Sequence, residues 1–88
     1  MIIKFSKTFA KQRNKAPKKI QKELDKRIKL FIENYQNPLL RLHKLSGNLK
    51  NYHSINISGD WRAILKIIKK KEITIFLILK THSNLYKK

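Results

Sequence analysis

Residues 52–79, YHSINISGDWRAILKIIKKKEITIFLIL, decide the fold of this chain. Apolar side chains recur with a period of two along 52–57, 61–68 and 73–79, and all three segments are rich in Ile, Leu or aromatic residues, which is typical of β-strands. Ser58-Gly59-Asp60 provides a tight turn between the first two segments, and a polar tip at 69–72 separates the second from the third. Because short connections join antiparallel neighbours, this stretch predicts a three-stranded meander.

The N-terminal residues favour a strand followed by a short helix. Ile2, Ile3 and Phe5 give a β-prone opening. Ser6 is placed to cap the following helix, in which Phe9 would lie one helical turn from Phe5. The short N-terminal strand can join the same sheet as the meander.

A second helix is the clearest local pattern. Pro17 suits its first turn, and Asn37-Pro38 is expected to stop it. Its apolar residues recur at spacings of 4, 4, 3 and 4 residues, which is the helical period: Ile20, Leu24, Ile28, Phe31 and Tyr35. The basic residues between them form either a solvated face or a binding surface: Lys18, Lys19, Lys22, Lys26, Arg27 and Lys29.

These elements predict a single α+β domain over residues 1–88, because no Gly/Ser linker, low-complexity tract or repeat divides the chain. Two N-terminal helices would pack on one face of a small curved antiparallel sheet, in the order β-α-α-β-β-β. The other face of the sheet would stay open and, with this composition, basic. The expected functional site is therefore a concave cationic groove.

The composition argues against several classes of protein. The 88 residues include no cysteine, so neither disulfides nor a thiolate metal site can support the fold, and nothing indicates an oxidising compartment. No apolar stretch is long enough for a signal peptide or a membrane span. We therefore expect a cytoplasmic protein that is not inserted into a membrane.

Positive charge is the first pointer to a partner. The chain has 22 Lys and Arg residues against 5 Asp and Glu residues, a formal net charge of +17. Such an excess of like charge costs stability unless a polyanion shares the surface. An AT-rich gene would explain lysine in place of arginine, but not the shortage of acids. Nucleic acid is the expected partner, with an anionic membrane or an acidic protein as alternatives.

Two separated motifs carry a resemblance to a known family. The first reads LHKLSGNLKNY over 42–52 and SINISGDWR over 54–62, and the second reads THSNLY over 81–86. In this order they resemble the RelE/YafQ (RelE/StbE) toxins of the RelE/ParE superfamily. The resemblance implies the RelE-like fold and the toxin of a type II toxin–antitoxin system, which cleaves mRNA on the ribosome and binds a cognate acidic antitoxin. It implies neither a metal nor a cofactor.

The resemblance also assigns catalytic roles to five residues: His43, Asp60, Arg62, His82 and Tyr86. Structural alternatives stay open for most of them. His43 would otherwise be a loop histidine, Asp60 a turn residue and Arg62 a strand arginine paired with an acid. Tyr86 would otherwise be a C-terminal anchor. His82 is the strongest candidate, because the end of the last strand has no packing need for an imidazole.

Four further residues are expected to bind RNA. Lys44, Lys50 and Lys80 would hold phosphate through charge-assisted hydrogen bonds. Trp61 would either stack on a base or belong to the core as the largest apolar side chain.

These residue types suit attack of an RNA 2′-hydroxyl on the adjacent phosphate, which expels the 5′-oxygen and leaves a 2′,3′-cyclic or 3′-phosphate. Asp60 or His43 is the expected general base and His82 the general acid, while Arg62 would stabilise the phosphorane. Asn56 stands where YafQ-like chains often carry a second histidine, and asparagine cannot exchange protons. Proton transfer then falls on His43, Asp60 and His82, or the chain combines YafQ-like features with the more RelE-like Arg62.

Two rival functions remain open. ParE-like toxins share this fold and inhibit DNA gyrase without cutting RNA, so the fold alone does not decide the activity. An RNA-binding module without catalytic activity would show the same positive charge.

Overall fold

The computed structural model describes residues 1–47, 52–69 and 72–81. Within them the chain forms two helices, one short 3-10 helix and five strands, which confirms the predicted α+β fold. The elements are β1 (Ile2–Phe5), α1 (Lys7–Lys15), α2 (Lys18–Glu33), η1 (Pro38–Leu40), β2 (His43–Lys44), β3 (His53–Ser58), β4 (Trp61–Lys69) and β5 (Ile73–Thr81).

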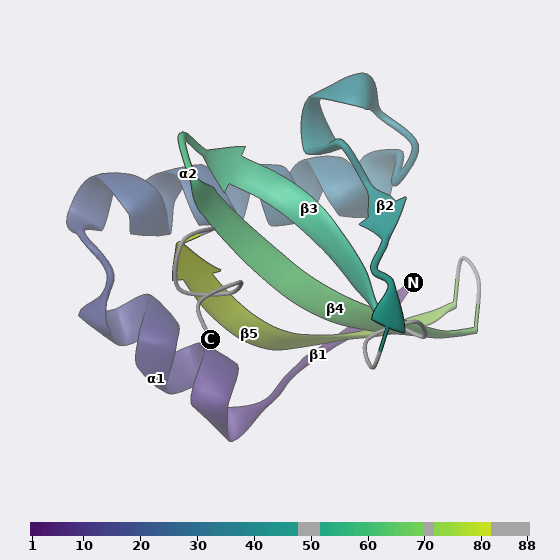
Figure 1. Cartoon of the computed structure of the whole chain (residues 1–88), viewed down its shortest axis with the longest axis horizontal. Coiled ribbons are helices and arrows are strands. Elements are labelled where there is room, and N and C mark those ends of the chain that lie inside the picture. The colour runs from purple at the N-terminus through teal and green to yellow at the C-terminus, as the bar shows by residue number, and fades with distance from the viewer. Residues whose placement is uncertain (48–51, 70–71, 82–88) are drawn as a thin grey trace.

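The sheet has the strand order β1-β5-β4-β3-β2 (Figure 1). The meander is confirmed, because β3 pairs antiparallel with β4 and β4 pairs antiparallel with β5. The N-terminal strand joins the same sheet, as expected, but it runs parallel to β5, with Ile2 opposite Ile73 and Phe5 opposite Phe76. The sheet is therefore mixed rather than wholly antiparallel.

The edge strand β2 is an addition that the sequence did not predict. It consists of His43 and Lys44, which pair with Ser54 and His53 of β3. Two residues are too few to show an alternating pattern, so the segment looks like a loop in the sequence. Its pairing attaches the first of the two motifs to the edge of the sheet.

Both helices lie on one face of the sheet, as predicted, with α2 behind it in Figure 1. Phe9 of α1 and Phe31 of α2 contact Phe76 of β5, at ring-centroid distances of 5.6 and 5.7 Å. All three rings are buried, and each contributes roughly 1.5–3 kcal/mol by leaving water. This aromatic cluster fixes the helices against the centre of the sheet.

Side-chain hydrogen bonds mark the start of α1 and the end of α2. The Ser6 hydroxyl accepts the Phe9 N–H at 2.9 Å and caps α1, as predicted. Helix α2 ends at Glu33, four residues before the expected stop at Asn37-Pro38. The Asn34 side chain instead accepts the Gln36 N–H at 3.1 Å, and this local bond competes with continuation of the helix.

The two helices are also clamped to each other at the surface. Arg13 of α1 donates two hydrogen bonds to Asp25 of α2, at 3.2 and 2.7 Å. The hydrogen bond that Arg13 donates to Asp25 raises the pKa of Arg13, so this guanidinium stays charged.

None of the helices in the described part of the chain is both long and apolar enough to span a membrane.

Candidate functional site

The face of the sheet opposite the helices, here called the front face, carries the first group of candidate residues. Ala63 and Leu65 of β4 point into the core, so the neighbouring Arg62 points to the front. Cross-strand partners share a face, and Arg62 lies opposite both Asn56 of β3 and Lys80 of β5. The structure therefore places Asn56, Arg62 and Lys80 in one row.

Arg62 is anchored by the backbone rather than by an acid. Its Nη1 donates to the carbonyl of Gly59 at 2.8 Å and to the carbonyl of Trp61 at 2.9 Å. Gly59 adopts a φ of +54°, the left-handed conformation that lets the β3–β4 turn bring its carbonyl here. Among the described residues Arg62 has no ion pair, so its remaining N–H groups are available to an anion.

Asn56 and Lys80 complete the row in different ways. Lys80 is exposed beside Arg62, so two cations stand next to each other on adjacent strands. The Asn56 backbone carbonyl accepts a hydrogen bond from Arg27 at 3.1 Å, while its side-chain Oδ1 is buried and has no hydrogen-bond partner in the described structure. A buried acceptor without a donor is costly to stability.

Asp60 and Trp61 lie at the β3–β4 turn, but they point in different directions. Asp60 is exposed in the turn between Gly59 and Trp61, the two residues whose carbonyls hold Arg62. Trp61 packs against the core on the helix side of the sheet, which agrees with its structural interpretation. A role for Trp61 in base stacking stays a prediction.

His43 and Lys44 stand at the β2 edge of the sheet, and both are exposed. The His43 Nδ1 lies 2.8 Å from the Arg41 carbonyl, which can only accept, so Nδ1 carries the hydrogen. The Nε2 atom of neutral His43 is then left as a proton acceptor. His43 is two strands away from Arg62, roughly 10 Å across the sheet, so the two side chains form separate parts of any site.

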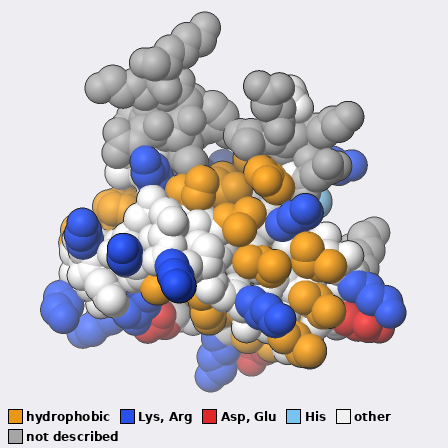
Figure 2. Space-filling model, turned by 90° about the horizontal axis from the view of Figure 1, so that it is seen from below, with side chains coloured by type: hydrophobic (Ala, Val, Ile, Leu, Met, Phe, Trp, Pro, Cys, Tyr) orange, Lys and Arg blue, Asp and Glu red, His pale blue; other side chains and the backbone are white. Residues whose placement is uncertain are grey.

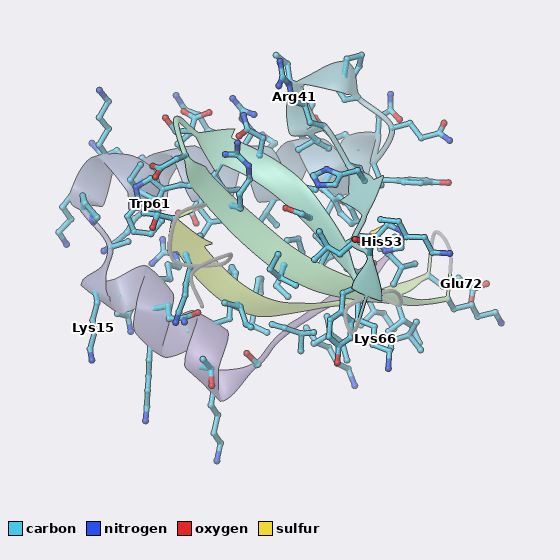
Figure 3. All side chains as sticks on the ribbon, viewed as in Figure 1. Lys15, Arg41, His53, Trp61, Lys66 and Glu72 are labelled. Atoms are coloured by element: carbon cyan, nitrogen blue, oxygen red, sulfur yellow. The ribbon has the colours of Figure 1, made fainter. Side chains whose placement is uncertain are left out.

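A hollow of about 470 Å³, here called the β2 hollow, opens beside His43 and Lys44. Figure 3 shows two of the residues that line it, Arg41 next to η1 and His53 near β2. The complete lining is Tyr35, Gln36, Asn37, Pro38, Arg41, Leu42, His43, Lys44, His53 and Ile67. Sequence reasoning missed Arg41 and His53, because neither lies at a motif position that the resemblance assigns to function.

The front face, which the sequence predicts to be basic, carries isoleucines as well as cations. In one cross-strand row Ile75 lies between Lys66 and Lys4. The row of Ile64 and Ile78 lies between that row and the row of Arg62 and Lys80. Positive charge also extends elsewhere, since Figure 2 shows Lys and Arg side chains around an apolar area on the face seen from below. None of the five acids lies within a strand, however, so no carboxylate competes within the cross-strand rows.

Three predicted site residues, Lys50, His82 and Tyr86, lie outside the described residues. The last described residue of β5, Thr81, pairs with Trp61 and so lies beside the β3–β4 turn. Of the other predicted residues, Arg62 and Lys80 are brought together, Asp60 adjoins them at the turn, and His43 and Lys44 are held apart at the β2 edge.

Solved structures that match this fold include toxins. YafQ from E. coli strain BL21(DE3) has a TM-score of 0.79 and 25% sequence identity, with 97% of each chain covered. YafQ in the E. coli DinJ-YafQ toxin-antitoxin complex has a TM-score of 0.71 and 25% identity, covering 97% of this chain and 96% of that one. The YoeB/ParE toxin from Agrobacterium tumefaciens has a TM-score of 0.78 at 12% identity, covering 93% and 99%, and supports the fold alone.

The sequence itself agrees with a family model. No curated protein sequence matches the chain significantly. The family model for the ParE toxin of the type II toxin-antitoxin system parDE, however, matches residues 3–85, which is nearly the whole chain. Together with the YafQ and YoeB/ParE folds, this match confirms the resemblance carried by the two motifs. The chain therefore belongs to the ParE toxin family of type II toxin–antitoxin systems, within the RelE/ParE superfamily.

Proposed function

We propose that this toxin is an endoribonuclease that cleaves mRNA on the ribosome. The observation that carries the proposal is the pair of adjacent cations on the front face, Arg62 and Lys80, with Arg62 fixed by two backbone carbonyls. A guanidinium held in this way needs little reorganisation when negative charge develops on a phosphate, which is how preorganised donors lower a barrier.

The proposed reaction needs two proton transfers: one proton is taken from the RNA and one is given to it. A general base takes the 2′-hydroxyl proton, the 2′-oxygen bonds to phosphorus, and the bond from phosphorus to the 5′-oxygen breaks. The general acid protonates that oxygen, and a 2′,3′-cyclic phosphate is left. Asp60, next to the Arg62 anchors, or His43, through its free Nε2, serves as base; His82 serves as acid. No metal or cofactor takes part.

The separation of the candidate catalytic residues supports a need for the ribosome. Arg62 and His43 lie on strands that are not neighbours in the sheet. A flexible RNA would rarely meet both in the reactive geometry, whereas an mRNA held by the ribosome is already ordered. Tyr86 and Trp61 would then hold a base, and Lys44, Lys50 and Lys80 would contact backbone phosphates.

An acidic antitoxin is the proposed protein partner. The net charge of +17 calls for a polyanionic partner when the toxin is not on the ribosome. Exposed apolar side chains, among them Ile2 and Phe5, add a surface for the apolar residues of such a partner. The similar YafQ fold occurs in a complex with the antitoxin DinJ. We place both proteins in the cytoplasm, and treat residues 1–88 as one domain.

A second candidate function is inhibition of DNA gyrase without RNA cleavage. It is favoured by one observation, that the matching family model is the ParE toxin of parDE. An inert RNA-binding module has no such support, because the family consists of toxins. The fold does not separate the two toxic activities, so an experiment has to.

Expression of the chain alone distinguishes them. If translation is the target, growth should stop within minutes and translated mRNAs should fragment, while untranslated RNAs stay intact. Sequencing of RNA ends measures the fragmentation of mRNA. A supercoiling assay with purified DNA gyrase and the purified chain tests the alternative function. Loss of supercoiling activity with intact mRNA would show that the gyrase function is the right one.

A further inference from the structure

We propose that the β2 hollow is a nucleotide-binding site, which takes the phosphate and the base of an RNA residue next to the bond being cleaved. The inference deepens the proposed function and rests on it for the identity of the strand. Binding itself does not require cleavage, so the two can be tested apart.

Charge in the hollow suits a phosphate. Arg41, His43 and Lys44 line it, and none of its lining residues is an acid. Arg41 and Lys44 are both exposed, so their charged ends are reachable from solvent. A guanidinium presents paired N–H donors that match the oxygens of a phosphate, and an ammonium adds a further charge-assisted hydrogen bond.

The backbone of Arg41 holds these groups in place. Arg41 has a φ of +49°, which makes it the one non-glycine residue in the described structure with a left-handed backbone. Its N–H donates to the Pro38 carbonyl at 3.2 Å, and its own carbonyl lies 2.8 Å from the His43 Nδ1. This conformation is unfavourable for a residue with a side chain, and such strain concentrates at binding and catalytic sites. Here it fixes the His43 ring against the Arg41 backbone.

The rest of the lining suits a base. Tyr35 and His53 provide flat ring faces, and Leu42 and Ile67 provide apolar surface. Unstacked RNA bases are recognised by stacking on Tyr or His side chains. A volume of about 470 Å³ also falls within the range of small-ligand pockets. An acidic peptide would use the cations of the hollow but would gain nothing from its rings.

The location of the hollow relates it to the front face. Its residues Lys44 and His53 pair across the β2–β3 ladder and face the helix side of the sheet, whereas His43 pairs with Ser54, which shares the front face with Asn56 and Arg62. Two strand spacings, roughly 10 Å, separate β2 from β4. An RNA strand on the front face can therefore pass over the β2 edge at His43 and place a neighbouring nucleotide in the hollow.

Binding can be measured by NMR titration of the 15N-labelled full-length chain. The probes are uridine 3′-monophosphate, inorganic phosphate and tetraglutamate. We expect uridine 3′-monophosphate to shift the backbone signals of Arg41, His43, Lys44 and His53 and the ring signals of the two histidines. Its affinity should be at least fivefold higher than that of inorganic phosphate. Equal binding by tetraglutamate, or shifts confined to other parts of the chain, would overturn the proposal.

Two variants separate the phosphate from the base. Arg41→Gly removes the guanidinium but keeps the left-handed backbone that glycine tolerates, so it should fold and weaken both uridine 3′-monophosphate and phosphate at least fivefold. Tyr35→Leu keeps apolar packing near Phe31 and should weaken only the nucleotide. Lys11→Gln, in α1, removes the same charge far from the hollow and should change neither affinity by more than twofold.

The outcome is distinct from that of the cleavage assay. If the nucleotide binds in the hollow but the chain cuts no mRNA, the proposed function fails and the binding site stands. If mRNA is cut and Arg41→Gly binds uridine 3′-monophosphate as tightly as the wild type, the binding site fails.

Discussion

Arg62 shows how a single residue can be placed by its sequence and yet be understood only from its contacts. Its position after Asp60-Trp61 put it on a strand and in a family motif, but left open an ion pair with an acid. The structure has carbonyl oxygens of Gly59 and Trp61 in that role. No sequence pattern reports such bonds, because any residue can supply a carbonyl. They depend on the conformation of the turn.

Substitutions of Arg62 and His82 test the catalytic role proposed for each residue. Arg62→Ala should lower the single-turnover rate of mRNA cleavage on ribosomes by roughly 10²-fold, as loss of a transition-state donor does, with little change in the salt dependence of binding. His82→Ala should lower that rate by roughly 10²- to 10⁴-fold, since it removes the general acid. Rapid-quench kinetics measures both. A loss below threefold for either variant would place that residue outside the chemistry.

Sequence reasoning missed His53 for a related reason. The residue begins β3 and faces the helix side of the sheet, where alternation alone predicts a core position. Only the pairing of β3 with the short strand β2 and the nearby end of α2 turn this position into part of a hollow. Lys50, His82 and Tyr86 lie beyond the described residues, so their roles rest on the motifs.

Among the elements, the long segments were readable from periodicity and the short ones were not. The α2 pattern and the three strands of the meander have enough residues to show their periods. The four residues of β1 indicated a strand but not its partner, because parallel pairing with β5 is a contact between the two ends of the chain. The α2 end was missed because the Asn34 side-chain bond is local and weakly encoded.

Arg27 links three elements and gives a test of the fold. Its side chain, only 17% exposed, donates to Glu23, to the Leu39 carbonyl at 2.7 Å and to the Asn56 carbonyl at 3.1 Å. It therefore links α2 to η1 and β3. From the sequence alone, Arg27 is one of a group of basic helix residues that form either a solvated face or a binding surface.

We expect Arg27→Gln to lower the free energy of unfolding by about 2–4 kcal/mol, because charge-assisted hydrogen bonds to two carbonyls are lost. Lys26→Gln, one residue earlier on the exposed side of α2, should change it by less than about 0.5 kcal/mol. Urea unfolding followed by circular dichroism measures both variants. Equal effects of the two substitutions would contradict the linking role of Arg27.

At the scale of the whole molecule, the sequence gives the net charge directly but does not show where on the surface the charged residues lie. A net charge of +17 points to a polyanion, but the lysines are spread over several faces and are interspersed with isoleucines on the front face. Strand alternation fixes which residues share a face only after the register is known. The predicted concave basic groove thus becomes a cationic row, Arg62 and Lys80, and a separate hollow beside β2.

Salt dependence tests the contribution of this charge to binding. Affinity for ribosomes should fall with salt with a log–log slope of about −0.7 per phosphate contacted on a single strand, so roughly six contacts give a slope near −4. Replacing Lys44 and Lys50 by glutamine should make the slope shallower by about one to two units, while a pre-bound complex still cleaves. Filter binding over a salt series measures the slope. A flat dependence for the wild type would remove nucleic acid as the partner.

The central claim is that the chain itself cuts mRNA on the ribosome through attack by the 2′-hydroxyl. The most direct measurement mixes purified toxin with purified ribosomes that hold a defined mRNA, and identifies the chemical groups at the new RNA ends. We predict a 2′,3′-cyclic or 3′-phosphate on one fragment and a 5′-hydroxyl on the other, with the same mRNA uncut when the ribosome is left out. Intact mRNA on the ribosome, or ends that carry a 5′-phosphate and a 3′-hydroxyl, would contradict the account.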